Sequence, residues 1–248
     1  LNSTAATTFS GIVGGSTKLT GIITNSGGTV VFNTTAISTD GDQTYNDAAT
    51  LGGNITFTTT GDNIVFASTL NSDSTTRTLD IVAGSGDTTF SDAVGGSAAL
   101  GNTTIGTAAL DATAIKVQGT LAITNSGAGA ITGIISNGSS AAIITKAGAG
   151  TLTLSGDNTY TGATTVNAGV LAITHADALG GTSGATTVAN NAALNISGGI
   201  TTAAEAITIS GTGVSNRGAI RNISGDNVIA GQITIAAHTE IASDSGTL

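Results

Sequence analysis

The chain has very few of the residues that usually fill a globular core. It contains no Pro, Cys, Met or Trp, and only 3% of its 248 residues are aromatic. Large rings and Met side chains normally fill irregular interiors, so a core of ordinary shape is not expected. The absence of Cys excludes disulfides and thiol chemistry. The apolar content of 39% comes mostly from Ala, Ile, Val and Leu, which suit a narrow interior built of repeated layers.

Charged residues are scarce as well. They make up 8% of the chain, against about a quarter in an average protein. Six Lys and Arg stand against fifteen Asp and Glu, so the net charge is −9. The basic residues do not cluster in the sequence and are Lys18, Arg77, Lys116, Lys146, Arg217 and Arg221. Because a protein that binds a phosphate backbone needs a cationic stripe, we expect no nucleic-acid partner.

Long hydrophobic runs are also missing. No stretch of about 18 uncharged apolar residues occurs, so we expect no membrane insertion by this segment. The chain starts at Leu1 without an initiator Met and has no signal-peptide pattern. We therefore expect residues 1–248 to form a single segment of a longer repetitive protein.

Thr, Gly and short β-type runs dominate what is present. Thr accounts for 47 residues and Gly for 37, and the mean hydropathy of +0.31 argues against disorder. The runs alternate in polarity or are β-branched, and they end at Gly, Asn, Asp or Ser. Examples are residues 29–32, 54–57, 63–66, 151–154 and 206–209. Helical periodicity is nearly absent, so these patterns predict an all-β fold.

Parts of the sequence repeat one another. Residues 7–16 return in similar form at 88–97, and residues 121–124 return at 171–174. A sandwich or a barrel would need hairpin turns and bulky inward side chains, and the chain has few of either. We therefore predict a right-handed parallel β-helix (a β-solenoid) with about ten rungs of roughly 20–27 residues each. The offset between the first two similar stretches is then expected to equal three or four rungs.

One stretch is similar to a known family. Residues 145–173 contain Lys146, regularly spaced Gly, the run TLTL at 151–154, and Tyr160. This stretch closely resembles the autotransporter-associated β-strand repeat. Residues 1–120 more loosely resemble the repeats of filamentous-haemagglutinin-type exoproteins. Both resemblances imply β-helical passengers that bacteria display or secrete for adhesion, aggregation or biofilm formation, and neither implies catalytic residues.

The residues within 145–173 have physical roles that fit such a coil. Five Gly are expected where the backbone takes a positive φ or approaches a neighbour closely, at Gly148, Gly150, Gly156, Gly162 and Gly169. Apolar side chains are expected to point inward at Leu152, Leu154, Val166, Leu171 and Ile173. Asn158 and Asn167 suit turns in which the side-chain amide bonds local backbone, and stacking of their amides in ladders is the alternative expectation. Tyr160 is expected to cap a corner rather than to stack on a ligand.

Metal-binding and nucleophilic patterns are not found in the sequence. His175 and His238 are distant from each other in the sequence, and neither lies in a run of further ligands. Serines are common, but none lies in a nucleophile elbow. The Thr at residues 58–60 do not recur at every rung, as an ice-binding face would require.

Many parallel β-helices act on polysaccharides through pairs of carboxylates. The candidates are Asp40 with Asp42, Asp87 with Asp92, and Glu205 alone. Each lies in a turn-like stretch without a nearby basic or aromatic partner, so we expect solvated turn residues. We therefore predict no catalytic, cofactor-binding or metal-binding residue, with weak Ca²⁺ binding at turns such as 40–42 as an open alternative.

These observations favour a non-catalytic structural and adhesive segment of a bacterial cell-surface or secreted fibre. The expected location is extracellular, and the expected partner is a host or neighbouring-cell surface or another copy of the chain. Two alternatives remain open: a self-assembling filament or surface-layer component, and a polysaccharide-acting β-helix enzyme.

Overall fold

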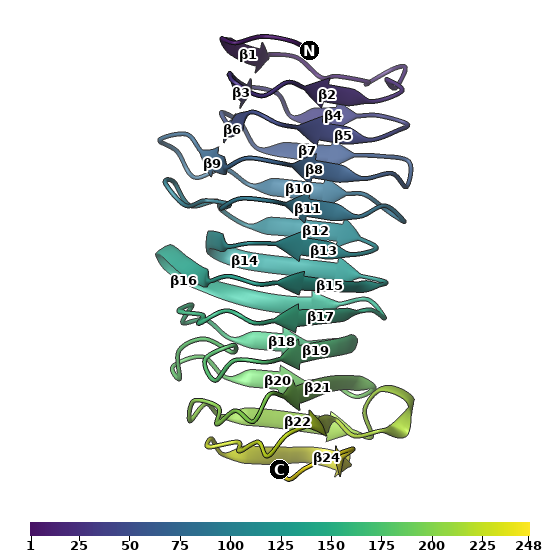
Figure 1. Cartoon of the computed structure of the whole chain (residues 1–248), viewed down its shortest axis with the longest axis vertical. Helices are drawn as coiled ribbons and strands as arrows, with labels where there is room; N and C mark the ends of the chain where they lie inside the picture. The colour runs from purple at the N-terminus through teal and green to yellow at the C-terminus, as the bar shows by residue number, and fades with distance from the viewer.

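The computed structural model describes residues 1–248. Every strand in it pairs in parallel with a strand one turn away. The chain winds through about 11 turns and forms no α-helix (Figure 1). Its only helical element is one 3₁₀ turn, η1 (Val214–Asn216). The predicted all-β parallel solenoid is confirmed, with slightly more turns than the ten expected. No helix is long and apolar enough to cross a membrane.

The strands form three sheets along the coil. The first sheet covers only the N-terminal turns and contains β1 (Ala6–Phe9), β3 (Thr29–Phe32), β6 (Ala48–Leu51) and β9 (Leu70–Ser72). The second contains β4 (Ala36–Ser38), β7 (Ile55–Thr58), β10 (Leu79–Val82), β12 (Thr103–Thr107), β14 (Ile115–Asn125), β16 (Ile135–Ala147), β18 (Thr164–Val166), β20 (Thr186–Val188), β22 (Ile207–Gly211) and β24 (Ile233–Thr239). The third contains β2 (Ile22–Thr24), β5 (Gln43–Tyr45), β8 (Ile64–Phe66), β11 (Thr88–Phe90), β13 (Leu110–Ala112), β15 (Ala128–Ile131), β17 (Thr151–Leu154), β19 (Gly169–Ile173), β21 (Ala192–Ser197), β23 (Ile220–Ser224) and β25 (Ile241–Ser243).

The length of a rung varies along the coil. A short rung separates Thr103 from its ladder partner Leu121, whereas a longer rung separates Ile207 from its partner Ile233. The predicted rung length is therefore close, but the lower limit of the predicted range is slightly too high. Rungs differ because the corners differ in length while the strands between them keep their register.

The interpretation of the sequence echoes as whole rungs is wrong. Phe9 lies in β1 of the first sheet, whereas its counterpart Phe90 lies in β11 of the third sheet. Likewise Leu121 lies in β14 and Leu171 in β19, which belong to different sheets. Each face of the coil needs the same inward and outward alternation, so a similar strand motif fits any face. Local similarity therefore reports a strand environment and not an integral number of turns.

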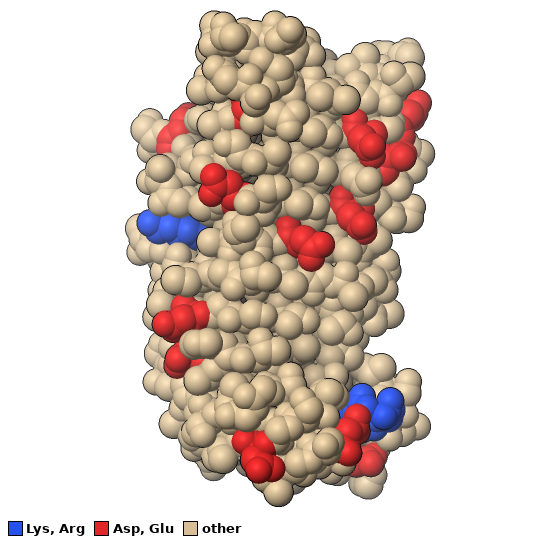
Figure 2. Space-filling view, viewed as in Figure 1, with Lys and Arg blue, Asp and Glu red and all other residues tan.

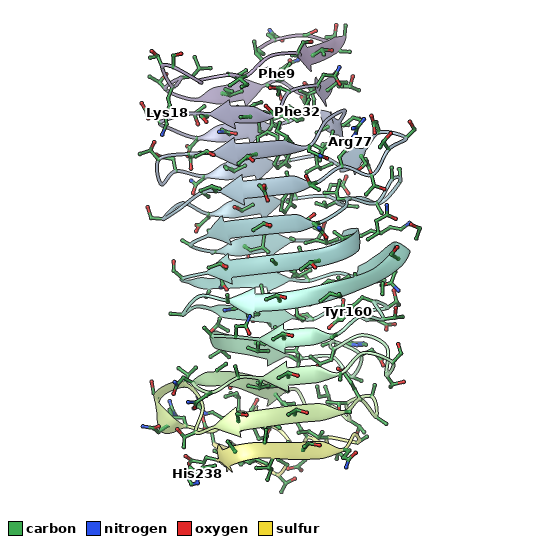
Figure 3. The ribbon with its side chains drawn as sticks, turned by 180° about the vertical axis from the view of Figure 1, so that it is seen from behind. Phe9, Lys18, Phe32, Arg77, Tyr160 and His238 are labelled. Carbon is green, nitrogen blue, oxygen red and sulfur yellow. The ribbon has the colours of Figure 1, made fainter.

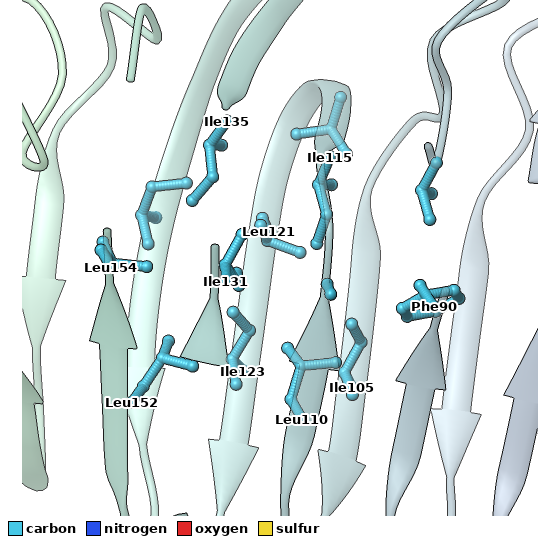
Figure 4. Packing of buried hydrophobic residues seen from close by; sticks show 14 of the residues in the cluster. Phe90, Ile105, Leu110, Ile115, Leu121, Ile123, Ile131, Ile135, Leu152 and Leu154 are labelled. Carbon is cyan, nitrogen blue, oxygen red and sulfur yellow. The ribbon is translucent and has the colours of Figure 1, made fainter. Parts of the chain in front are cut away.

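The core is one continuous column of side chains that point inward from the sheets. It contains 45 buried residues, from Ile22 near the N-terminal end to Ile220 near the C-terminal end. Figure 4 shows the central part, where Leu152 and Leu154 of β17 lie near Ile131 of β15 and Ile123 of β14. Burial of each such side chain contributes about 1.5–3 kcal/mol, and the column repeats in every rung.

The few aromatic residues are concentrated at one end of this column. All five Phe and Tyr45 form one connected series of ring contacts, with centroid distances between 4.9 and 5.5 Å. Phe9 and Phe32 lie near the N-terminal end, and Tyr160 lies far along the coil (Figure 3). The sequence offered no sign of this stack, because its rings come from separate strands that meet only when the rungs pile up.

Candidate functional site

The segment that resembles a passenger repeat spans more than one turn of the coil, because it contains both β17 and its ladder partner β19. Its five predicted inward residues, Leu152, Leu154, Val166, Leu171 and Ile173, are all buried, which confirms that prediction. Gly148 and Gly169 have φ values of +77° and +68°. At Gly150 an added Cβ would lie only 2.0 Å from the carbonyl oxygen of Gly127 one rung away. Both reasons expected for Gly, positive φ and close approach, therefore apply here.

Lys146 occupies an inward position that the sequence did not predict for it. The register places it between Ile123 and Val166 in the ladder of the second sheet. Its Nζ donates to the carbonyl oxygens of Ala147 at 2.8 Å, Gly148 at 3.1 Å and Ala168 at 3.2 Å. Burial lowers the pKa of Lys146 to about 8, and no carboxylate contributes to this shift. Three carbonyls thus take the place of water around a buried ammonium group.

Two further side chains of the repeat were predicted to bond local backbone. Asn158 is buried; its Oδ1 accepts the N–H of Ile135 at 2.7 Å, and its Nδ2 donates to the carbonyl of Ala178 at 2.6 Å. These partners are one rung before and one rung after it, so the expectation of a local backbone bond is wrong for Asn158. Asn167 is exposed.

Tyr160 is fully buried, and its hydroxyl hydrogen-bonds the Oγ1 of Thr164 at 2.6 Å. An added Cβ at Gly180 would lie 3.0 Å from two carbons of the Tyr160 ring, so the next rung packs directly on that ring. The ring therefore fills a corner and has no exposed face for a ligand, as predicted. Burial raises the pKa of the Tyr160 hydroxyl well above its ordinary value.

This segment of the coil is the part that known proteins share. Residues 144–173 match the passenger-associated-transport-repeat family. The segment predicted from the sequence, 145–173, agrees with that match to one residue. No curated protein and no solved structure matches the chain. The repeat and the solenoid fit an autotransporter passenger domain, and this repeat family implies a secreted or surface-exposed protein.

Outside the passenger repeat, the candidate carboxylates form part of the coil itself. The Oδ1 of Asp42 accepts the N–H of Asn63, the Oδ1 of Asn63 accepts the N–H of Asp87, and the Oδ1 of Asp87 accepts the N–H of Ala109. Each of these bonds measures 2.9 Å and joins one rung to the next. Asp42 and Asp87 therefore lie two rungs apart in one ladder of side chains whose oxygens accept the backbone N–H groups at the corners.

The other two carboxylates of the candidate pairs also accept hydrogen bonds. Asp40 accepts the hydroxyl of Thr60 at 3.1 Å, and Asp92 accepts the N–H of Ala93 at 2.7 Å. The Nζ of Lys18 lies 3.8 Å from Asp40, so the expectation of no nearby basic partner is wrong for Asp40. On the face drawn in Figure 2 the acidic side chains are scattered as separate groups and do not line one groove. The weak Ca²⁺ site at residues 40–42 stays a prediction.

Glu205 differs from the solvated turn residue that the sequence predicted. Only 2% of its surface is exposed. Its Oε1 accepts the hydroxyl of Thr186 at 2.7 Å, whereas its Oε2 is buried without a hydrogen-bond partner. Burial raises the pKa of the Glu205 carboxyl to about 7, and the bond from Thr186 opposes part of that rise. The prediction failed because the corner after β21 folds inward, which the neighbouring Ala residues do not reveal.

The two histidines lie far apart in the structure. His238 is exposed on the last rungs (Figure 3). His175 lies beside Asp157 and Asp177, with one donor atom of each within 4.8 Å of the others. The Nδ1 of His175 accepts the N–H of Asp177 at 3.2 Å, and both side chains are more than 40% exposed. One exposed and two half-buried donors without a fourth ligand or an orienting outer shell do not make a built metal site.

Proposed function

We propose that the chain is a non-catalytic structural and adhesive segment of an extracellular bacterial fibre, displayed on the cell surface or secreted. The observation that carries this proposal is the uninterrupted parallel coil, which contains a passenger repeat. About 11 rungs at roughly 4.8 Å each make a rod on the order of 50 Å long. A rod of this kind holds its outer surface away from the cell that carries it.

The placement of the carboxylates supports a structural reading over the enzyme alternative. Glycosidases need a pair of carboxyl groups that can act on a bound sugar. Asp42 and Asp87, one from each candidate pair, instead each accept a backbone N–H from the next rung. Nothing in the passenger repeat or the fold favours catalysis.

Adhesion can be tested with beads coated with the purified chain. Folded chain is expected to retain beads on bacterial or host cells, or to aggregate the beads with one another. A matched coat of Leu152→Asp, which places a charge at a fully buried position, is expected to lose that retention because the coil opens. Equal retention by both coats, or release of sugar from a polysaccharide panel by the folded chain, would contradict the proposal.

A further inference from the structure

One corner of the coil turns an acidic side chain into the core. Residues 198–206 connect β21 to β22, which are both labelled in Figure 1, and we call this segment the Glu205 corner. It contains no strand, and its one bridge pairs Thr201 with Val228 of the following rung. The segment that covers Glu205 is therefore irregular, unlike the strands on either side of it.

Hydrogen bonds attach the Glu205 corner to the rungs before and after it. Backbone N–H groups donate to backbone carbonyls from Thr186 to Ala206, from Ala203 to Ala176, from Thr202 to Val228 and from Val228 to Ile200. Two bonds to side chains complete the attachment, from the N–H of Ile200 to Asn227 and from the N–H of Ala230 to Thr202. If the corner opens, these N–H groups reach water, so their hydrogen exchange reports directly on opening.

The site of the Glu205 carboxyl suits the neutral form and not the charged form. Glu205 is almost fully buried, and its Oε1 accepts a single hydrogen bond, from the Thr186 hydroxyl. Its Oε2 has no hydrogen-bond partner. A buried carboxylate needs several donors or a cation to replace the water that it loses, whereas a protonated carboxyl carries no charge to compensate. Ionisation therefore makes the closed corner unfavourable.

The ionisable groups around Glu205 do not compensate its charge. Those on the neighbouring corners are Asp157, Tyr160, His175, Asp177 and Asp226. Burial raises the pKa of the Glu205 carboxyl, the bond from Thr186 opposes that rise, and no basic side chain contributes to lowering it. The charge of Glu205 in turn helps to raise the pKa of the Tyr160 hydroxyl. A charged Glu205 thus gains a counter-charge only from solvent, which the closed corner excludes.

We propose that the Glu205 corner is a pH-sensitive switch, which is closed while the carboxyl is protonated and opens locally when the carboxyl ionises. Opening brings water to the carboxylate and breaks the hydrogen bonds between the corner and its two neighbouring rungs. Distant rungs keep their pairing, because each rung of a solenoid depends mainly on its neighbours. The surface of the C-terminal rungs therefore changes with pH, and this inference does not rest on the proposed adhesive function.

The direction of the switch follows from the protonation of the two forms. In the closed corner the Glu205 carboxyl has a pKa of about 7, whereas solvent in the open corner returns it towards the ordinary 4.5. The closed form is favoured most below pH 4.5, and this advantage is lost as the pH rises through 7. The ratio of open to closed corner is therefore expected to rise about tenfold or more between pH 5 and pH 8.

The test is amide hydrogen exchange of the full isotope-labelled chain, followed by NMR at pH 5 and pH 8 and corrected for the intrinsic exchange rate. The amides of Thr186, Thr202 and Val228 are expected to lose protection about tenfold or more at pH 8. The amides of Phe57 and Phe66 in the aromatic rungs are expected to change less than about twofold. Unchanged protection at the corner, or an equal loss in the aromatic rungs, would overturn the proposal.

Two variants identify the carboxyl that acts. Glu205→Gln cannot ionise, so its corner amides are expected to keep the same protection at pH 5 and pH 8. The matched control Glu240→Gln removes an exposed carboxyl and is expected to lose protection at the corner as the parent chain does. A pH-dependent loss that persists in Glu205→Gln would overturn the proposal. The comparison of corner with aromatic rungs uses the parent chain alone, so the test holds even where Glu205→Gln weakens the coil.

Discussion

Replacement of Glu205 by Gln is expected to remove most of the dependence of stability on pH between 4.5 and 7. The carboxyl has a pKa of about 7 in the folded chain, above the ordinary value of 4.5. Between these values the folded state keeps a proton that the unfolded state has lost, so the free energy of unfolding falls as the pH rises. The contribution of Glu205 is fully present below pH 4.5 and is lost above pH 7.

The size of this effect follows from the pKa difference. At about 1.4 kcal/mol per pKa unit the full shift corresponds to about 3 kcal/mol, and screening by nearby solvent reduces this to about 2 kcal/mol. Gln keeps the shape of the protonated carboxyl and can still accept the Thr186 hydroxyl that now bonds Oε1. The variant should therefore be as stable as the parent at pH 5 and more stable by about 2 kcal/mol at pH 8.

Urea denaturation followed by circular dichroism at pH 5, 6, 7 and 8 measures the effect. Glu240→Gln is the control, because Glu240 is the only other Glu and is exposed. This control should keep the pH dependence of the parent chain. If Glu205→Gln and the parent lost stability equally between pH 5 and pH 8, the reasoning from the buried carboxyl would be refuted.

Three further substitutions test the core and the corners. Phe57→Ala removes a ring that contacts three others and should lower the free energy of unfolding by about 3–5 kcal/mol in urea titrations; a loss below about 1 kcal/mol would contradict the stacked core. Gly150→Ala places a Cβ 2.0 Å from the Gly127 carbonyl and should lower the melting temperature, whereas Gly11→Ala, with open space around it, should not; equal effects would refute the steric cause. Lys146→Met should abolish the rise in stability that is expected between pH 8 and 10.5, because in this range the unfolded chain binds a proton that the folded chain has lost. If the Lys146→Met variant showed the same rise, Lys146 would be excluded as its source.

The regular part of the fold was predictable because each strand position has a simple requirement. Leu152 and Leu154 alternate with Thr, and this period of two places them inward whichever face of the coil carries them. Gly148 and Gly150 were predictable because only Gly tolerates the backbone geometry of that corner. The assignment of strands to faces was not predictable in this way, since all faces share the same alternation.

The exceptions depend on partners that are distant in sequence. From the sequence alone Lys146 is expected to point outward. In the fold its ammonium group donates to the carbonyl of Ala168, 22 residues later, which holds it inside. Arg221 and Asp244 are 23 residues apart and meet because that separation is one rung. A single sequence does not give the length of each rung, so the ion pair between Arg221 and Asp244 was recognisable only after folding.

The position of these exceptions along the coil follows from how a solenoid distributes its stability. Each rung is stabilised by its own packing and by its two neighbours, so a weak rung affects mainly the rungs next to it. The connected rings lie in the N-terminal rungs, up to Phe90, whereas the buried carboxyl of Glu205 and the corner that contains it lie in the C-terminal rungs. Unpaired buried oxygens at Asn195 and Glu205 can persist there without loosening the aromatic end.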